Sequence, residues 1–394
     1  MAYDFHKLKT VSVADGAVTL RIPERWDVVP HERDEGRWGC YEEEVEGEDT
    51  DTGTLWIGIQ HFQYNCESVG DQQDTRMMAE QFSQRREPND PPYLENVVQP
   101  VDQGHRWFRM FDGEEDGDRL RFWFSHLFLK RGDHVAIAHF NFVLPHYRMD
   151  DPEFVELREI MEREIEAAFL DPFRKDEIEE IEQLFGPLQI CNFDNQVKIE
   201  LPEAMGCWPH GGDDDPPDKC WYCRLDIGTS HAGMFVYADD LNFAFEEDGP
   251  QMGEPSGEGG DKETQGADDE ISREILEHVF QKVVSEWTGV PEDIPRNIRM
   301  PWGIVHYEVT DDQDSGDVSD DTDADAADEN RPLRNHLWKL LCHDGLRNRR
   351  VQVLLMTAIA DANKPPYAAL AAYMQRAVRR AEFPGFPAPE RYPA

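Results

Sequence analysis

The sequence predicts an α+β fold made of two tandem modules, each an antiparallel β-sheet flanked by helices. Two observations carry this prediction: an internal repeat, and in each half a run of alternating strands that is interrupted and then closed by amphipathic helices. At 394 residues, with 39% hydrophobic residues and 21 Phe, the chain is long and apolar enough to build two packed cores.

The repeat is visible when the chain is aligned with itself. Residues 18–26 match 197–205 at a shift of 179, and residues 120–121 match 333–334 at a shift of 213. The second shift continues into the last expected helix of each half, where apolar residues recur three and four positions apart. These residues are Phe154, Leu157, Met161, Ile165 and Ala168 in the first half and Tyr367, Leu370, Met374, Val378 and Ala381 in the second.

Each half is expected to follow the order β-β-β-α-β-β-β-α. The elements expected in the first half are strands at 18–22, 39–45 and 54–62, a helix at 74–84, strands at 107–112, 120–129 and 134–144, and a helix beginning at Pro152. In the second half, strands are expected near Val197, Trp221 and Met234, followed by a helix at 270–287, three strands and a helix at 365–380.

We expect the first module to span 1–172, a helical connector 173–190 and the second module 191–394. The two repeat shifts differ because the second half carries acidic, low-complexity segments at 246–270 and 310–331. Both segments have too few apolar residues to pack, so we expect disordered insertions at hairpin tips, where extra length leaves the core undisturbed.

The charge balance excludes several classes of partner. With 82 Asp and Glu against 39 Lys and Arg, the formal net charge is −43, which repels nucleic-acid phosphate and anionic lipid. No run approaches 18 apolar residues, so no membrane insertion is expected. The absence of an apolar leader and the odd number of cysteines, seven, favour a cytoplasmic location. The acidity itself has three open explanations: adaptation to a salty environment, recognition of a basic partner, and mimicry of an acidic polymer.

The opening strand of each half carries a short motif, Leu20-Arg-Ile-Pro23 with Trp26 and Ile199-Glu-Leu-Pro202 with Met205. With the order of strands and helices, this motif resembles the PsbP-like superfamily, and within it the bacterial type VI secretion effector chaperones. The resemblance implies a non-enzymatic, protein-binding role, and the tandem repeat would then be a pseudo-dimer within one chain, with a concave surface between its halves. The second half lacks the tryptophan of the motif.

One cluster in the second half has metal-ligand chemistry. Cys207, His210, Cys220 and Cys223 supply four ligands of the kinds that tetrahedral zinc prefers. Residues three apart on a strand face opposite sides, however, which separates Cys220 from Cys223. Zinc binding, a redox pair and ordinary thiols all remain open at this point, and we assign no metal site and no cofactor.

Nothing in the sequence indicates catalysis. Neither a phosphate-cradling glycine loop nor the motifs of zinc peptidases and serine hydrolases occur. We therefore expect no enzyme and assign no catalytic residue. The alternative is a metal-dependent or hydrolytic enzyme centred on the Cys/His cluster.

The other functional signal is aromatic. Large rings occupy both faces of the expected strands, so one face covers the core and the other is available for contacts between the halves or for a peptide groove. The residues predicted to bind are Trp56, Trp107, Phe122, Trp123, Phe124, Phe140 and Phe142. We expect a chaperone, adaptor or immunity-type protein that binds a partner with hydrophobic or basic segments through this aromatic sheet face or through the cleft between the modules.

Overall fold

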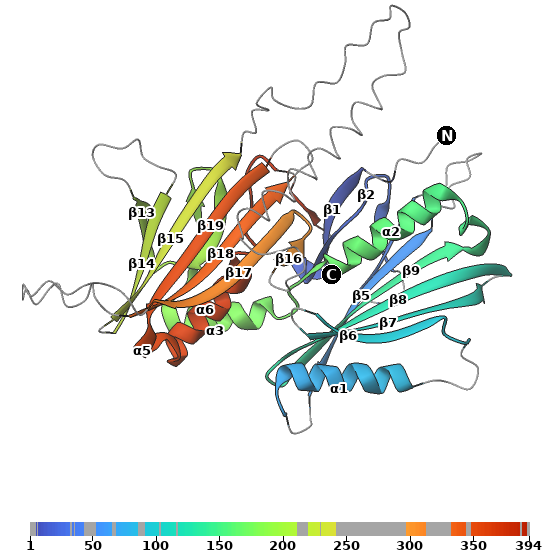
Figure 1. Cartoon of the computed structure of the whole chain (residues 1–394), viewed down its shortest axis with the longest axis horizontal. Coiled ribbons are helices and arrows are strands. Elements are labelled where there is room, and N and C mark those ends of the chain that lie inside the picture. The colour runs from blue at the N-terminus through green and yellow to red at the C-terminus, as the bar shows by residue number, and fades with distance from the viewer. Residues whose placement is uncertain are drawn as a thin grey trace, which may run out of the picture. The chain divides into compact units, whose positions relative to one another are not determined.

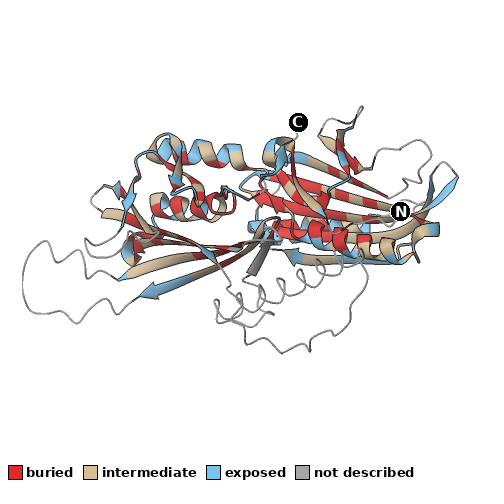
Figure 2. Ribbon diagram, turned by 90° about the horizontal axis from the view of Figure 1, so that it is seen from above, coloured by how far each residue is buried: buried red, intermediate tan, exposed pale blue. Residues whose placement is uncertain are grey.

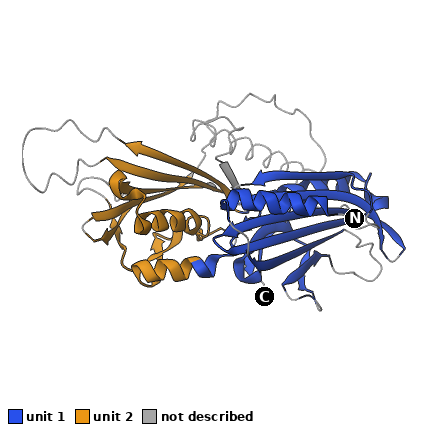
Figure 3. Cartoon of the chain, turned by 90° about the horizontal axis from the view of Figure 1, so that it is seen from below, with its two compact units in different colours: residues 1–176, 299–301, 388–394 blue, residues 177–298, 302–387 orange. Residues whose placement is uncertain are grey.

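The computed structural model describes residues 5, 7–31, 34, 36–42, 53–64, 68–85, 91–101, 104–115, 117–210, 220–228, 230–241, 297–312, 332–343, 348–386 and 388–391. The expected helix at 270–287 and the insertion at 246–270 lie outside these residues, as do 313–331 of the second insertion. The chain forms two compact units, one of residues 1–176, 299–301 and 388–394 and the other of 177–298 and 302–387 (Figure 3).

The described residues form two seven-stranded sheets with the same strand order: β3-β4-β5-β9-β8-β7-β6 and β13-β14-β15-β19-β18-β17-β16. The strands of the first sheet are β3 (Asp27–Pro30), β4 (Arg37–Tyr41), β5 (Thr54–Gln63), β6 (Glu95–Val101), β7 (Gly104–Glu115), β8 (Asp118–Arg131) and β9 (His134–Pro145). The strands of the second are β13 (Gly206–Pro209), β14 (Cys220–Ile227), β15 (Ser230–Leu241), β16 (Asn297–Met300), β17 (Gly303–Asp312), β18 (Leu333–His343) and β19 (Asn348–Ala358).

Two smaller sheets and a few helices complete the described part. A sheet of order β10-β2-β1-β20 is formed by β1 (Leu8–Val13), β2 (Val18–Pro23), β10 (Phe169–Leu170) and β20 (Glu390–Arg391). A hairpin is formed by β11 (Leu188–Phe193) and β12 (Val197–Pro202). The helices are α1 (Asp71–Gln84), α2 (Pro152–Glu166), α3 (Arg174–Phe185), α5 (Ile359–Ala362) and α6 (Pro365–Ala377). None of the helices in the described ranges is long and apolar enough to cross a membrane.

The expected α+β class, with helices flanking each sheet, is wrong, because the chain is mostly β with large antiparallel sheets and few helices. The strands run further than the sequence pattern indicated: β7 and β9 have 12 residues each and β8 has 14. Moreover, β1 and β6 lie where no strand was expected. Pro100 lies within β6, and it is tolerated there because β6 is an edge strand, where a missing N–H breaks no ladder.

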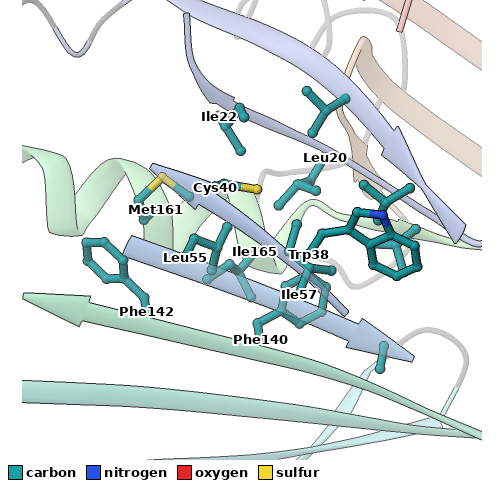
Figure 4. Packing of buried hydrophobic residues seen from close by; sticks show 14 of the residues in the cluster. Leu20, Ile22, Trp38, Cys40, Leu55, Ile57, Phe140, Phe142, Met161 and Ile165 are labelled. Atoms are coloured by element: carbon teal, nitrogen blue, oxygen red, sulfur yellow. The ribbon is translucent and has the colours of Figure 1, made fainter. Parts of the chain in front are cut away.

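The core of the first unit lies on one side of its large sheet. Figure 4 shows Phe140 and Phe142 of β9 together with Met161 and Ile165 of α2 in one apolar cluster. Figure 2 shows buried and half-buried residues alternating along these strands, as expected when successive side chains point to opposite faces. Burying each of these large apolar side chains contributes about 1.5–3 kcal/mol to folding.

Helix α1 packs against β6, β7 and β8 on the other side of the same sheet (Figure 1). Its buried Ala79 belongs to a small cluster with Trp107, Phe128, Val135 and Ile137. This cluster is separate from the core beside α2, so the helix covers one end of this side of the sheet.

Candidate binding surface

The side of the first sheet opposite α2 carries a patch of half-buried rings. Strand alternation places Phe122 and Phe124 of β8 on this side and Trp123 on the core side. The register of the strands determines the neighbours of Phe124. It is paired with Arg109 of β7 on one side and with Asn141 of β9 on the other. The patch is here called the aromatic face and consists of Trp56, Arg109, Phe111, Phe122, Phe124, His126, His139 and Asn141.

The phenylalanine rings of the aromatic face lie nearly parallel. Phe111 stacks on Phe122 and on Phe124, with ring centroids 5.2 and 5.5 Å apart and interplanar angles of 19° and 9°. Phe122 also lies across Gly113, where a Cβ would come within 2.9 Å of the ring. Glycine therefore lets the ring lie close to the sheet, and the result is a flat, half-buried aromatic surface.

A polar anchor holds α1 at the edge of this surface. Asp74 accepts a hydrogen bond from Ser68 Oγ at 2.6 Å and forms an ion pair with Lys130 Nζ at 3.1 Å. The hydroxyl of Ser68, together with Lys130 and the Tyr64 hydroxyl, lowers the pKa of Asp74 to about 2. The Asp74 carboxylate is therefore charged at neutral pH, and it ties the first turn of α1 to β8.

Two histidines meet in the aromatic face. The Nδ1 atoms of His126 and His139 are 2.6 Å apart, so one ring donates a hydrogen bond to the other. Burial lowers the pKa of His139 to about 4 and the pKa of His126 well below its usual value. Both rings are consequently neutral at pH 7. The donor carries its proton on Nδ1, so the acceptor carries its proton on Nε2.

The seven residues predicted to bind are divided between the two sides of the sheet. Trp56, Phe122 and Phe124 lie in the aromatic face. Trp107 is on the same side, but it is buried beside α1, with its Nε1 donating to Asn96 Oδ1 at 2.7 Å.

Trp123, Phe140 and Phe142 lie on the opposite side of the sheet and are buried in the core. The structure places them with the helix α2, so they serve to pack the first unit. They are separated from the aromatic face by the thickness of the sheet.

The polar members of the aromatic face were missed from sequence because residues were chosen for being aromatic. Arg109 lies between Trp107 and Phe111 at strand spacing, and His126 continues the series that Phe122 and Phe124 begin. Period-two alternation alone would have put them on this face. Their contacts depend on pairing with distant strands, which no local pattern indicates.

The four residues of the Cys/His cluster in the second unit do not come together as one group. Cys207 and Cys223 are partners in register across β13 and β14, with Cα atoms 4.1 Å apart, and they form a disulfide. Cys220 is outside this disulfide, and the His210 ring packs on Phe235. Among the described residues, no group of three or more His, Cys, Asp or Glu side chains is arranged to hold a metal ion.

Comparison with known proteins gives only a distant likeness of fold. No family model matches the chain, and no curated protein matches it. Solved structures with some similarity include LpqN of Mycobacterium tuberculosis, involved in cell envelope biogenesis, at 11% identity and a TM-score of 0.30 over 42% of this chain and 91% of that one. The Ran-binding protein Mog1p of Saccharomyces cerevisiae matches at 9% identity and a TM-score of 0.28 over 42% of this chain and 96% of that one.

A Bacteroides thetaiotaomicron protein matches at 14% identity and a TM-score of 0.26, over 45% of this chain and 57% of that one. At these values the solved structures carry no argument about function. They also do not confirm the PsbP-like resemblance or the link to type VI effector chaperones.

Proposed function

We propose that the chain is a non-enzymatic protein-binding protein, a chaperone or adaptor, and that its aromatic face holds a segment of the partner. The observation that carries the proposal is the stack of half-buried rings of Phe111, Phe122 and Phe124 on a sheet face where α1 occupies one end. Contiguous aromatic surface of this kind is typical of interaction sites, because a partner that covers it removes apolar area from water.

The composition of the face supports binding by side-chain stacking. Aromatic residues and arginine are the types most enriched at the energetic centres of protein interfaces. Here four rings surround the Arg109 guanidinium, and the Phe rings are already held in place by one another. A partner therefore meets a surface that loses little side-chain entropy on binding.

The alternative, an enzyme centred on the Cys/His cluster, has less support. A cysteine in a disulfide supplies no thiolate, so Cys207 and Cys223 provide neither a nucleophile nor a metal ligand while they are joined. Disulfides are more typical of oxidising compartments than of the cytosol. The cytoplasmic location therefore stays a prediction.

The proposal is tested by panning a library of displayed random peptides on the full chain. Peptides that bind through the aromatic face should bind the Phe124→Ser variant about 10- to 100-fold more weakly, because truncating an aromatic anchor commonly costs 2 kcal/mol or more. Ile190→Ser is the matched control, since Ile190 is an exposed apolar residue on β11 of the other unit. Loss of binding in both variants, or in neither, would contradict the proposal, provided that circular dichroism shows both variants folded.

A further inference from the structure

Arg109 is held in the aromatic face without an acidic partner. Its guanidinium carbon lies 4.6 Å from the centroid of Phe124, 4.9 Å from Trp107 and 5.6 Å from both Phe111 and Tyr93. Its Nη1 donates a hydrogen bond to Tyr93 Oη at 3.1 Å. Among the residues that the structure describes, no carboxylate lies within ion-pair distance, 4.0 Å, of this arginine.

This isolation contrasts with several other arginines of the first unit. Arg21 pairs with Glu164, Arg106 with Glu166 and Arg121 with Asp112, at 2.6–2.8 Å. The chain has 82 acidic residues for 39 basic ones, so carboxylates are the commonest charged neighbours available. A half-buried guanidinium surrounded by rings instead has lost part of its hydration and has not gained an ion pair in return.

Several polar atoms at and beside Arg109 have no hydrogen-bond partner among the described residues. In the described part of the structure, Arg109 Nε, His126 Nε2, His139 Nε2 and an amide atom of Asn141 are buried and make no hydrogen bond. Register places these residues next to one another: Asn141 and Arg109 flank Phe124, and His126 faces His139. Buried polar atoms nearly always have hydrogen-bond partners, so four unpaired atoms on adjacent positions distinguish this part of the face, and a polar group of a bound segment would supply partners for them.

The charge of the site selects its ligand. The two histidines are neutral, because burial lowers the pKa of each, so Arg109 is the cation among these four polar side chains. Carboxylate, like phosphate, is a group that arginine binds in a planar arrangement of two hydrogen bonds. A single negative charge is tolerated near a chain of net charge −43, whereas a polyanion such as nucleic acid is repelled as a whole.

We propose that the aromatic face binds an acidic–aromatic peptide segment, in which an Asp or Glu carboxylate pairs with Arg109 and flanking apolar side chains stack on Phe111, Phe122 and Phe124. This inference rests on the proposed function, since it names the chemistry of the partner at the same face. It differs from the partner expected from net charge alone. The net charge of the chain determines which molecules it attracts from a distance, whereas the Arg109 guanidinium determines which group pairs with the face on contact.

The first part of the test uses the peptides selected on the wild-type chain. Peptides that bind in a Phe124-dependent manner should contain an Asp or Glu within a few residues of an aromatic or large apolar residue. Replacing that acid by its amide should weaken binding to the wild-type chain at least about tenfold, because the guanidinium is then left desolvated opposite a neutral group. This arm uses only the native chain, so it does not depend on the folding of any variant.

The second part is a double-mutant cycle with Arg109→Gln. If the peptide acid pairs with Arg109, its amide analogue and the parent peptide should bind Arg109→Gln within about twofold of each other. Arg119→Gln is the matched control, because Arg119 is an exposed arginine of β8 that pairs with Asp112, and the amide substitution should keep its full effect there.

The outcomes separate this inference from the proposed function. If Phe124-dependent peptides lack an acid, or if the amide substitution weakens binding equally to the wild-type chain and to Arg109→Gln, the carboxylate assignment is overturned while a binding face remains. If no selected peptide depends on Phe124, both are overturned.

Discussion

At the scale of single residues, the histidine pair is the most unusual feature of the aromatic face. His126 lies between Trp107 and Phe124, at ring-centroid distances of 4.8 and 5.9 Å, and its Nδ1 meets His139. Two charged side chains act on the pair: Arg109 lowers the pKa of His126, and Arg37 lowers the pKa of His139. Burial and these cations all favour the neutral rings.

We therefore expect acid to destabilise the fold through these histidines. An unfolded histidine takes up a proton near pH 6.5, whereas His139 in the folded chain does so only near pH 4. Between these values the unfolded state binds more protons, so stability falls as the pH drops from 6.5 towards 4. For His139 alone the loss at pH 5 is about 2 kcal/mol.

Urea denaturation of the wild-type chain and of His139→Gln at pH 7 and pH 5 measures this effect. The variant should lose less stability than the wild type on acidification. His134→Gln is the control, since its side chain is 65% exposed, and it should follow the wild type. An equal loss in His139→Gln and the wild type would contradict this account of the pair.

At the scale of elements, two glycines fix how the long strands approach each other. Gly104 begins β7 opposite Leu129, and Gly303 begins β17 opposite Cys342. A Cβ at Gly104 would lie 2.0 Å from the carbonyl oxygen of Phe128, and one at Gly303 would lie 1.9 Å from that of Leu341. The residues opposite the two glycines, Leu129 and Cys342, are related by the repeat shift of 213 residues, and so are the two carbonyls. The same close contact therefore occurs in both units.

We expect Gly104→Ala and Gly303→Ala each to destabilise its unit by roughly 1–3 kcal/mol or more, because the new methyl group meets backbone atoms that cannot rotate away. Gly132→Ala is the control: its φ of 56° strains alanine, but nothing lies within 4 Å, so the cost should be about 1 kcal/mol. Chemical denaturation of the three variants measures the difference. If Gly104→Ala destabilises the chain no more than Gly132→Ala does, β7 and β8 do not approach each other this closely at Gly104.

The elements also show what the sequence could predict. The alternation of Phe122, Trp123 and Phe124 indicated that β8 has apolar residues on both sides. In the structure Trp123 lies in the core, whereas Phe122 and Phe124 lie on the other side of the sheet. The α+β class was wrong because strands such as β1 and β6 were missed. In β6, Val97 and Val98 are adjacent and Pro100 follows, so its seven residues carry no alternating hydrophobic period. Arg109 was beyond prediction for a different reason: its lack of a carboxylate depends on which distant strands surround it.

At the scale of the whole molecule, the net charge of −43 opposes folding, because carboxylates are brought closer together in the compact state. Several ion pairs between arginine and carboxylate relieve this locally in the first unit, such as Arg21 with Glu164. Most of the 82 acidic residues have no cation to match them, since there are only 39 Lys and Arg. Mobile ions must screen the remainder.

Salt should consequently stabilise the chain. Raising NaCl from about 0.1 to 1 M shortens the screening length from about 10 to 3 Å. We expect the melting temperature to rise by at least about 4 °C, the shift that on the order of 1–2 kcal/mol produces in a unit of this size. Sorbitol at matched osmolality is the control for general solvent effects and should produce a smaller shift. A melting temperature that is unchanged or lower at high salt would show that charge repulsion is not a significant cost.

The central claim, that the aromatic face is an open surface that holds a partner segment, is tested most directly by hydroxyl-radical footprinting with mass spectrometry. In the free chain, Phe122 and Phe124 should be oxidised, while Phe140 and Phe142 of the core should not. A saturating concentration of a peptide selected on the chain should then protect Phe122 and Phe124 specifically. If these two residues are as unreactive as the core phenylalanines in the free chain, or if the bound peptide leaves their oxidation unchanged, the account is contradicted.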